Sequence, residues 1–130
     1  MTKKTETGQY GENLACNYLI ANKYKIIDRN FSKPYGEIDI IAKYKDGTLV
    51  FVEVKTMTTY DTTNDEDALK PEDQLNPAKL KKVSKTALGY SNEHPELIRK
   101  SRGWRIDLIA IDLDKNKIPN IRHYENISLN

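Results

Sequence analysis

The stretch GEIDIIAKYKDGTLVFVEVK (residues 36–55) decides the fold, because two apolar strand patterns flank the turn-forming Lys45-Asp46-Gly47. It also carries charged side chains near the outer ends of both strands, namely Glu37, Asp39, Glu53 and Lys55. Side chains of a strand alternate between its two faces, so Glu37 and Asp39 share one face of the first strand. Glu53 and Lys55 likewise share one face of the second strand. Whether the two pairs meet depends on the length of the turn between the strands.

The turn has two candidate lengths, and each gives a different strand register. A two-residue Asp46-Gly47 turn places the two charged pairs on opposite faces of the hairpin. A three-residue turn, with Gly47 in the left-handed conformation of a bulge, pairs Asp39 with Glu53. The sequence favours the second register because it leaves one face without any polar side chain. That apolar face consists of Ile38, Ile40, Ala42, Val50, Val52 and Val54.

The favoured register predicts a metal site. Asp39 and Glu53 would have Cβ atoms about 5 Å apart, where like charges repel unless a cation neutralises them. Their carboxylates, with the carbonyl of Val54, are the hard oxygen ligands that Mg²⁺ or Mn²⁺ prefers. Lys55, one pleat away, is placed to act on the attacking water, which indicates metal-dependent phosphodiester hydrolysis. The alternative is an exposed sheet face on which Glu37 and Lys55 form a charge ladder.

The rest of the sequence predicts one α/β domain over residues 1–130. The chain is 38% hydrophobic, which is enough to bury a single core of modest size. Helices are expected at about 7–22 and from residue 77, and further strands at 24–31, 104–113 and 117–125. The acidic stretch 56–75 is too long for a simple connector, so it is expected to form a mobile loop.

Composition excludes several classes of protein. No apolar run approaches the roughly 20 residues that cross a bilayer, and no signal peptide is recognisable, so a cytoplasmic protein without a membrane partner is expected. The single Cys16 cannot form an internal disulfide. Together with only His94 and His123, it also cannot build a zinc site. These three residues are therefore expected to have ordinary structural roles.

Three further sets of charged residues bear on the function. Lysines on the polar face of the second helix could contact phosphates of a nucleic acid or could simply be solvated. They are Lys79, Lys81, Lys82 and Lys85. Arg105 and Asp107 share one strand face, where an ion pair between them accounts for both. Glu12 lies on the apolar side of the first helix, where a carboxylate needs a partner because burying an unpaired charge is costly.

The charged residues of the hairpin resemble the site of the PD-(D/E)XK nuclease superfamily, with Asp39 as the first acid and Glu53-Val54-Lys55 as the acid-x-Lys element. Within it, the chain is most similar to the YraN-like family of bacterial endonuclease-like proteins. The similarity lies in GQYGENLACNYL (8–19), Asn30-Phe31, GEIDIIA (36–42), FVEVK (51–55) and Arg105-Ile106-Asp107. Archaeal Holliday-junction resolvases have a comparable layout, with a helix glutamate before the strand acids.

The resemblance implies a restriction-endonuclease-like fold, with an αβββαβ core and a mixed sheet flanked by helices. It adds Glu12 to Asp39, Glu53 and Lys55 as a catalytic residue, and it implies Mg²⁺ or Mn²⁺ as the cofactor. The implied function is a divalent-metal-dependent endonuclease whose partner is a nucleic acid, with DNA expected first and branched DNA as a candidate substrate. A homodimer fits this layout, because many junction enzymes are dimers. The alternative is a non-catalytic nucleic-acid-binding or adaptor module that retains the fold.

Overall fold

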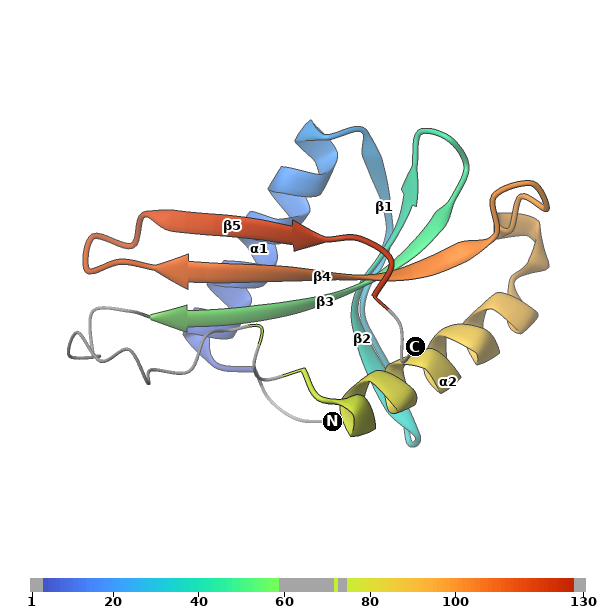
Figure 1. Cartoon of the computed structure of the whole chain (residues 1–130), viewed down its shortest axis with the longest axis horizontal. Coiled ribbons are helices and arrows are strands. Elements are labelled where there is room, and N and C mark those ends of the chain that lie inside the picture. The colour runs from blue at the N-terminus through green and yellow to red at the C-terminus, as the bar shows by residue number, and fades with distance from the viewer. Residues whose placement is uncertain (1–3, 59–71, 73–74, 128–130) are drawn as a thin grey trace.

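The structure, a computed structural model, describes residues 4–58, 72 and 75–127 (Figure 1). Its elements are α1 (Glu6–Ala21), β1 (Tyr24–Lys33), β2 (Gly36–Tyr44), β3 (Leu49–Thr58), α2 (Pro77–Glu93), the 3-10 turn η2 (Pro95–Leu97), β4 (Trp104–Leu113) and β5 (Pro119–Tyr124). This order contains the predicted αβββαβ core, followed by the predicted last strand.

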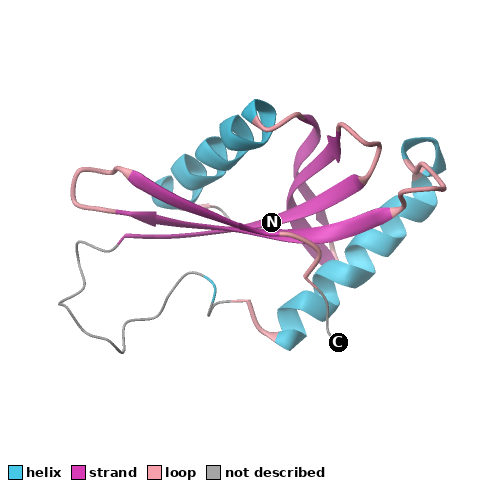
Figure 2. Cartoon of the chain, turned by 45° about the horizontal axis from the view of Figure 1, so that its top comes forward, coloured by secondary structure: helices cyan, strands magenta, loops and turns pink. Residues whose placement is uncertain are grey.

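The five strands form one mixed sheet in the order β1-β2-β3-β4-β5. Strands β3 and β4 are parallel, and the other neighbours are antiparallel. Helices α1 and α2 cover opposite faces of the sheet (Figure 2). The predicted α/β fold is thereby confirmed, and it is consistent with a restriction-endonuclease-like core.

The hairpin adopts the three-residue turn that the sequence favours. Gly47 has a φ of +95°, in the left-handed region, and its N–H donates to the Tyr44 carbonyl at 2.9 Å. The N–H of Tyr44 donates to the carbonyl of Thr48 at 2.9 Å, which closes the turn. The resulting register pairs Ile40 with Val52, as predicted.

Local sequence signals set the ends of the two helices. The Thr5 hydroxyl caps α1 by accepting the Gly8 N–H at 3.0 Å. The Asn76 side chain caps α2 by accepting the N–H of Lys79, and Pro77 occupies the first helical position. Pro119 begins β5, an edge strand, where its missing N–H is tolerated as predicted.

Two apolar clusters form the core, one on each face of the sheet. The first packs α1 against the sheet and includes Ala15, Leu19, Ala42, Val50, Val52 and Ile109. The second packs α2 against the other face and includes Leu80, Val83, Ala87, Tyr90, Ile41 and Phe51. Helix α2 thus covers the part of the second hairpin face that carries Ile41 and Phe51, while Glu37 is exposed and Lys55 is half-buried.

The predicted position of Ile38 is wrong. It packs in the cluster under α2, whereas Ile40 packs under α1, so the side chains do not alternate simply through Asp39. Opposite this point, Asn30 of β1 has a left-handed φ of 53°. The register of β1 with β2 pairs Arg29 with Ile40 and Phe31 with Ile38, and it has no pair between them. The change of face at Ile38 therefore coincides with this interruption of the β1–β2 pairing.

The predicted loop at 56–75 begins too early. Residues 56–58 belong to β3 and pair with β4, Thr56 opposite Ile111 and Thr58 opposite Leu113. Of the remainder, 59–71 and 73–74 lie outside the described residues, so the predicted mobility remains a prediction. Cys16 is buried and free, as expected. In the part of the chain that the structure describes, neither helix is long and apolar enough to cross a bilayer.

The close approach of α1 to β3 supplies a test of this packing. A Cβ at Gly11 would lie 1.9 Å from the Thr56 hydroxyl oxygen, so Gly11→Ala must push the helix away. We expect a loss of about 1–3 kcal/mol in the free energy of unfolding, measured by urea denaturation. Gly89→Ala in α2 is the control, since the nearest atom to its Cβ is 3.7 Å away. It should stabilise by up to about 1 kcal/mol, and equal effects of the two variants would contradict the packing.

Candidate active site

The candidate site lies where β2 and β3 stop pairing. Their ladder runs from Lys43–Leu49 to Ile40–Val52, and Asp39 and Glu53 come next in the same register. Beyond this point β2 runs downward and β3 to the left in Figure 1. The Asp39 carboxylate reaches across the gap, where its Oδ2 accepts the Val54 N–H at 2.8 Å. This hydrogen bond takes the place of a ladder bond and fixes the side chain against β3.

Glu53 lies buried beside Asp39. It is 8% exposed, and in the described part of the chain its Oε1 is buried without a hydrogen-bond partner. Burial raises the pKa of Glu53 well above its usual range, and the negative charge of Asp39 raises it further. The positive charges of Lys55 and Lys4 only partly offset this. The two strand acids therefore lie close enough to repel each other, as the sequence predicts.

Glu12 enters the site from α1 and is 2% exposed. Its carboxylate pairs with the ammonium of Lys4 and, at 3.3 Å, with the guanidinium of Arg29. Lys4 also donates to Asp39 Oδ1 at 2.6 Å, so one ammonium bridges the helix acid and the first strand acid. Burial disfavours the charge of Lys4, but the two carboxylates raise its pKa overall. Two cations of the chain itself thus supply the partner that a buried Glu12 needs.

A cleft of about 560 Å³ opens beside these carboxylates. Glu12, Asp39, Lys4 and Arg29 line it together with neutral side chains that can donate and accept hydrogen bonds. The neutral polar residues are Gln9, Asn13, Asn30 and Ser32. Phe31, Glu37 and Ile38 complete the lining. The cleft therefore gives a polar ligand access to Asp39.

The donor set fits a divalent cation held by a few protein oxygens. Among the described residues, no group of three or more His, Cys, Asp and Glu side chains gathers around one point. Asp39 and Glu53 with the carbonyl of Val54 match a hard cation that keeps several waters. The partnerless oxygen of Glu53 is the observation that supports this fit, because a buried carboxyl group normally has a partner. Lys55 lies near enough for its charge to act on Glu53.

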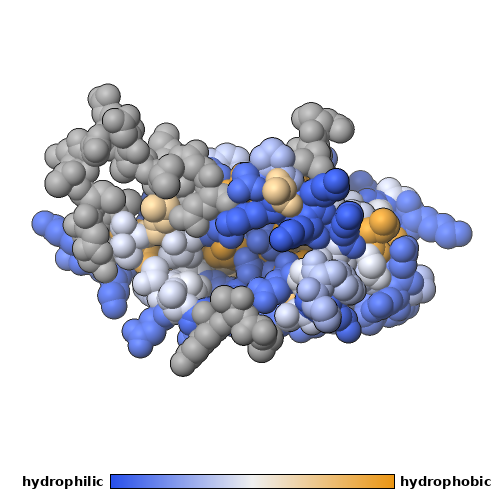
Figure 3. Space-filling view, turned by 90° about the horizontal axis from the view of Figure 1, so that it is seen from below, coloured by the Kyte–Doolittle hydropathy of each residue, from blue (hydrophilic) through white to orange (hydrophobic). Residues whose placement is uncertain are grey.

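The predicted nucleic-acid residues lie outside the cleft. Lys79, Lys81, Lys82 and Lys85 are all exposed on α2. The N-terminal half of this helix lies beside the start of β2, since a Cβ at Gly36 would be 3.7 Å from the carbonyl oxygen of Lys82. The face of the molecule seen in Figure 3 is mainly hydrophilic, with isolated hydrophobic residues. The lysines therefore form a solvated basic surface next to the strand that carries Asp39.

Comparison with known proteins places the chain in a family. Residues 11–111 match the family described as "Uncharacterised protein family UPF0102". The chain belongs to this family, which is the YraN-like family that the sequence resembles. The matched stretch contains Glu12, Asp39, Glu53 and Lys55, while Lys4 lies before it.

Relatives of similar length support this membership. A UPF0102 protein of Thermodesulfovibrio yellowstonii is 40% identical over 124 residues, which cover 95% of this chain and 96% of the relative. One of Geobacter sulfurreducens is 40% identical over 122 residues, 92% of this chain and 85% of the relative. One of Flavobacterium johnsoniae is 33% identical over 111 residues, 85% of each chain.

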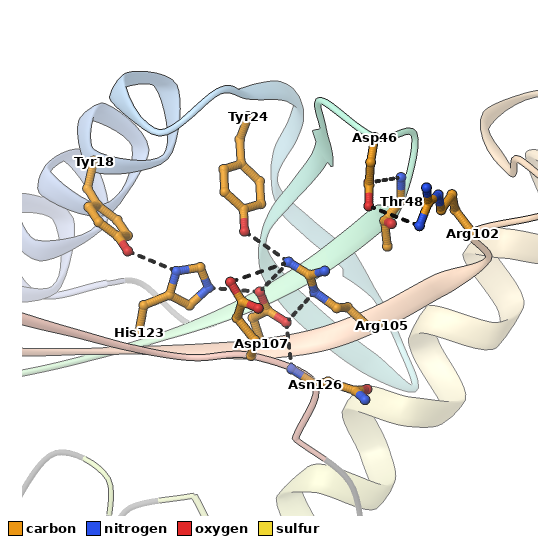
Figure 4. Close-up of polar contacts among 10 residues, drawn as sticks. Tyr18, Tyr24, Asp46, Thr48, Arg102, Arg105, Asp107, His123 and Asn126 are labelled. Carbon is orange, nitrogen blue, oxygen red and sulfur yellow. Dashed lines mark hydrogen bonds and ion pairs between the residues drawn. The ribbon is translucent and has the colours of Figure 1, made fainter.

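A second polar cluster surrounds Asp107 of β4, which is fully buried (Figure 4). Its carboxylate accepts hydrogen bonds from Arg105 Nε at 3.0 Å and from the Asn126 N–H at 2.9 Å. His123 Nε2 lies 2.8 Å from Asp107, and His123 Nδ1 lies 3.0 Å from the Tyr18 hydroxyl. Since a carboxylate only accepts, Nε2 carries the proton. The expected Arg105–Asp107 pair is confirmed, and the cluster joins α1, β4 and β5.

Sequence reasoning missed Lys4, Arg29 and the role of His123. A buried Glu12 signals that cations must lie nearby, but long side chains from a terminus or a strand reach it without any periodic pattern. His123 is 105 residues from Tyr18 and 16 from Asp107, so no local spacing indicates their contact.

Asp107 supplies a prediction of pH dependence. Burial disfavours its charge, but hydrogen bonds from His123, the Asn126 N–H and Arg105 outweigh this and lower the pKa of Asp107. Its ionised form therefore stabilises the fold above the unfolded pKa of about 4, and this contribution is lost as pH falls through the lower folded pKa. At pH 7, Asp107→Asn should cost about 3 kcal/mol, measured by urea denaturation.

The difference between the wild-type protein and Asp107→Asn should shrink as the pH falls below 4. The exposed acid Glu93 provides the control, since Glu93→Gln removes the same charge without breaking a buried contact. A stability difference that is unchanged at acid pH would show that the charge of Asp107 does not stabilise the fold.

Proposed function

We propose that this protein is a divalent-metal-dependent endonuclease that hydrolyses phosphodiester bonds of nucleic acid in the cytoplasm. The observation that carries this proposal is the convergence of Asp39 and Glu53 where β2 and β3 part. Glu53 holds a buried oxygen without a hydrogen-bond partner among the described residues, and the charges of Asp39 and of Lys55, two residues along the strand, act on its carboxyl group. Such an arrangement costs stability, which supports a role for Glu53 in function.

Each residue of the site has a role in the proposed reaction. Asp39, Glu53 and the Val54 carbonyl would hold Mg²⁺ or Mn²⁺, and Glu12 would act as an outer or second ligand. The ion, when bound, supplies a water of lowered pKa and a positive charge for the transition state. The Val54 N–H orients the carboxylate of Asp39 toward β3. Lys55 positions the attacking water and balances the negative charge that develops on the phosphate.

The cleft and the basic surface support a nucleic-acid substrate. Arg29 lies in the cleft beside Glu12 and Asn13 and is 38% exposed, so its guanidinium can also reach a phosphate. Amide side chains along the cleft can donate to and accept from sugars or base edges. The lysines of α2 extend positive charge beyond the cleft. DNA is the substrate expected first, with branched DNA as one form to test.

Substitution of the site residues tests this function. Glu53→Gln and Lys55→Ala should each lower Mn²⁺-dependent cleavage at least about 100-fold, because each removes a group that acts on the metal or its water. Cleavage is measured on branched, linear duplex and single-stranded DNA and on RNA, with Mg²⁺, Mn²⁺ or EDTA. Circular dichroism checks that each variant is folded.

Glu93→Gln is the matched control, because it removes one exposed acid far along α2 and should leave cleavage unchanged. Absence of cleavage by the wild-type protein on every substrate and with either metal would exclude the endonuclease. Equal loss in the control variant would show that the effect of Glu53→Gln is not specific to the site.

A non-catalytic nucleic-acid-binding module is the second candidate function. The four exposed lysines of α2 favour it, since their surface lies outside the cleft and does not depend on the carboxylates. Such a module binds through phosphate contacts alone, which makes its affinity strongly dependent on salt.

The lysine surface generates its own prediction. Replacing Lys79, Lys81 and Lys82 together by Gln should weaken nucleic-acid binding and lower the slope of log K against log salt by about 2–3, one counterion contact for each lysine. Fluorescence anisotropy at several salt concentrations measures this slope. Replacing the exposed Lys25, Lys100 and Lys115 is the control with the same charge change. Equal slopes for the two triple variants would show that α2 does not contact the backbone.

A further inference from the structure

Lys4 occupies the position of a cation in the candidate site. Its ammonium pairs with Glu12 of α1 and donates to Asp39 Oδ1 of β2 at 2.6 Å. Arg29, the other cation on Glu12, has its remaining hydrogen bond with Asn13 and not with Asp39. In the described part of the chain, the ion pair on the first strand acid thus comes from Lys4.

Both oxygens of Asp39 are engaged. Oδ2 accepts the Val54 N–H at 2.8 Å, and Oδ1 accepts the ammonium of Lys4. A divalent ion on Oδ1 would lie within about 4 Å of this ammonium, where two positive charges repel strongly at low dielectric. The ion and the ammonium therefore cannot share this oxygen without a large cost.

The backbone beside Lys4 is fixed, but its side chain can leave. Thr5, the next residue, caps α1 through its hydroxyl, which anchors the chain at the start of the helix. The side chain of Lys4 is 28% exposed, so rotation about its own bonds can carry the ammonium to solvent. Release of the site does not require α1 to move.

We propose that Lys4 is a built-in counter-ion that a divalent metal must displace, so that this residue at the N-terminal end of α1 sets the metal affinity of the site. The inference rests on the proposed function, because it takes Asp39 as a metal ligand. Without metal, the ammonium holds Glu12 and Asp39 together and relieves their repulsion. With metal, the ion takes over this role, and Lys4 turns to solvent or toward the phosphate of the substrate.

The test compares Mn²⁺ binding by variants of the full chain without substrate. Lys4→Met keeps most of the side-chain length and removes the charge, so it should bind Mn²⁺ about tenfold more tightly, the equivalent of one charge-assisted hydrogen bond. Lys4→Arg keeps a competing cation and should bind about as the wild type does. Binding is measured from the electron paramagnetic resonance signal of free Mn²⁺.

Lys33→Met is the matched control. Its ammonium lies over the ring of Phe31, which lines the same cleft, so the variant removes one charge nearby without freeing a carboxylate. It should change Mn²⁺ affinity less than about twofold. In metal-free buffer, Lys4→Met should also lower the melting temperature, whereas saturating Mn²⁺ should remove this difference.

The outcomes separate the inference from the proposed function. Tighter binding by Lys4→Met alone supports the inference. Equal affinities for wild type and Lys4→Met overturn it and leave the metal-dependent function standing. If neither protein binds Mn²⁺, both the inference and the metal-dependent function are wrong. An equal increase in Mn²⁺ affinity for Lys33→Met would show that the effect comes from the net charge of the protein and not from Lys4. It would also overturn the inference.

Discussion

The stability of this fold depends on how its buried carboxylates are paired with cations and hydrogen-bond donors. The free-energy cost of burying a charge without a partner is larger than the stabilisation that a single ion pair contributes. Each acid in the interior therefore needs hydrogen-bond donors or cations. Glu12 has Lys4 and Arg29, and Asp107 has Arg105, His123 and a backbone N–H. Glu53 is the exception, because one of its buried oxygens has no partner in the described part of the chain. The fold thus retains one unfavourable carboxyl group at the place where two strands separate.

The backbone of β1, β2 and β3 determines where β2 and β3 separate. The three-residue turn at Gly47 sets a register that puts Asp39 and Glu53 level with each other. The left-handed Asn30 then interrupts the pairing of β1 with β2 at the same height. Since the ladder also ends there on the β3 side, the Val54 N–H is left free for the carboxylate of Asp39. The pairing of β2 is therefore interrupted on both sides at Asp39. This residue lies on an inner strand of the sheet, and a backbone N–H holds its carboxylate.

The sequence could predict the parts of this arrangement that follow from periodicity. A shift of one residue would have placed charges on the apolar face of the hairpin, so the pattern alone selected the register of Asp39 and Glu53. Helical spacing likewise placed Glu12 on the buried side of α1. The face of Ile38 could not be predicted, because the alternation of side chains breaks where the β1–β2 pairing is interrupted, beside the left-handed Asn30. Lys4 was also beyond prediction, since a long side chain near a terminus can reach many partners.

The two polar clusters differ in how completely their acids are hydrogen-bonded. The cluster at Asp107 is complete, since every oxygen of the carboxylate has a donor and each ring nitrogen of His123 has a partner. Such a cluster fixes α1 against β4 and β5 and leaves no lone pair for a ligand. Around Asp39, the described part of the chain has the partly exposed cation Lys4, one buried oxygen of Glu53 without a hydrogen-bond partner, and an adjoining cleft. A ligand would bind there by displacing Lys4 or by supplying the missing contact of Glu53, and this difference in hydrogen-bond satisfaction, rather than the number of acids, distinguishes the candidate site of this UPF0102 protein from the cluster at Asp107.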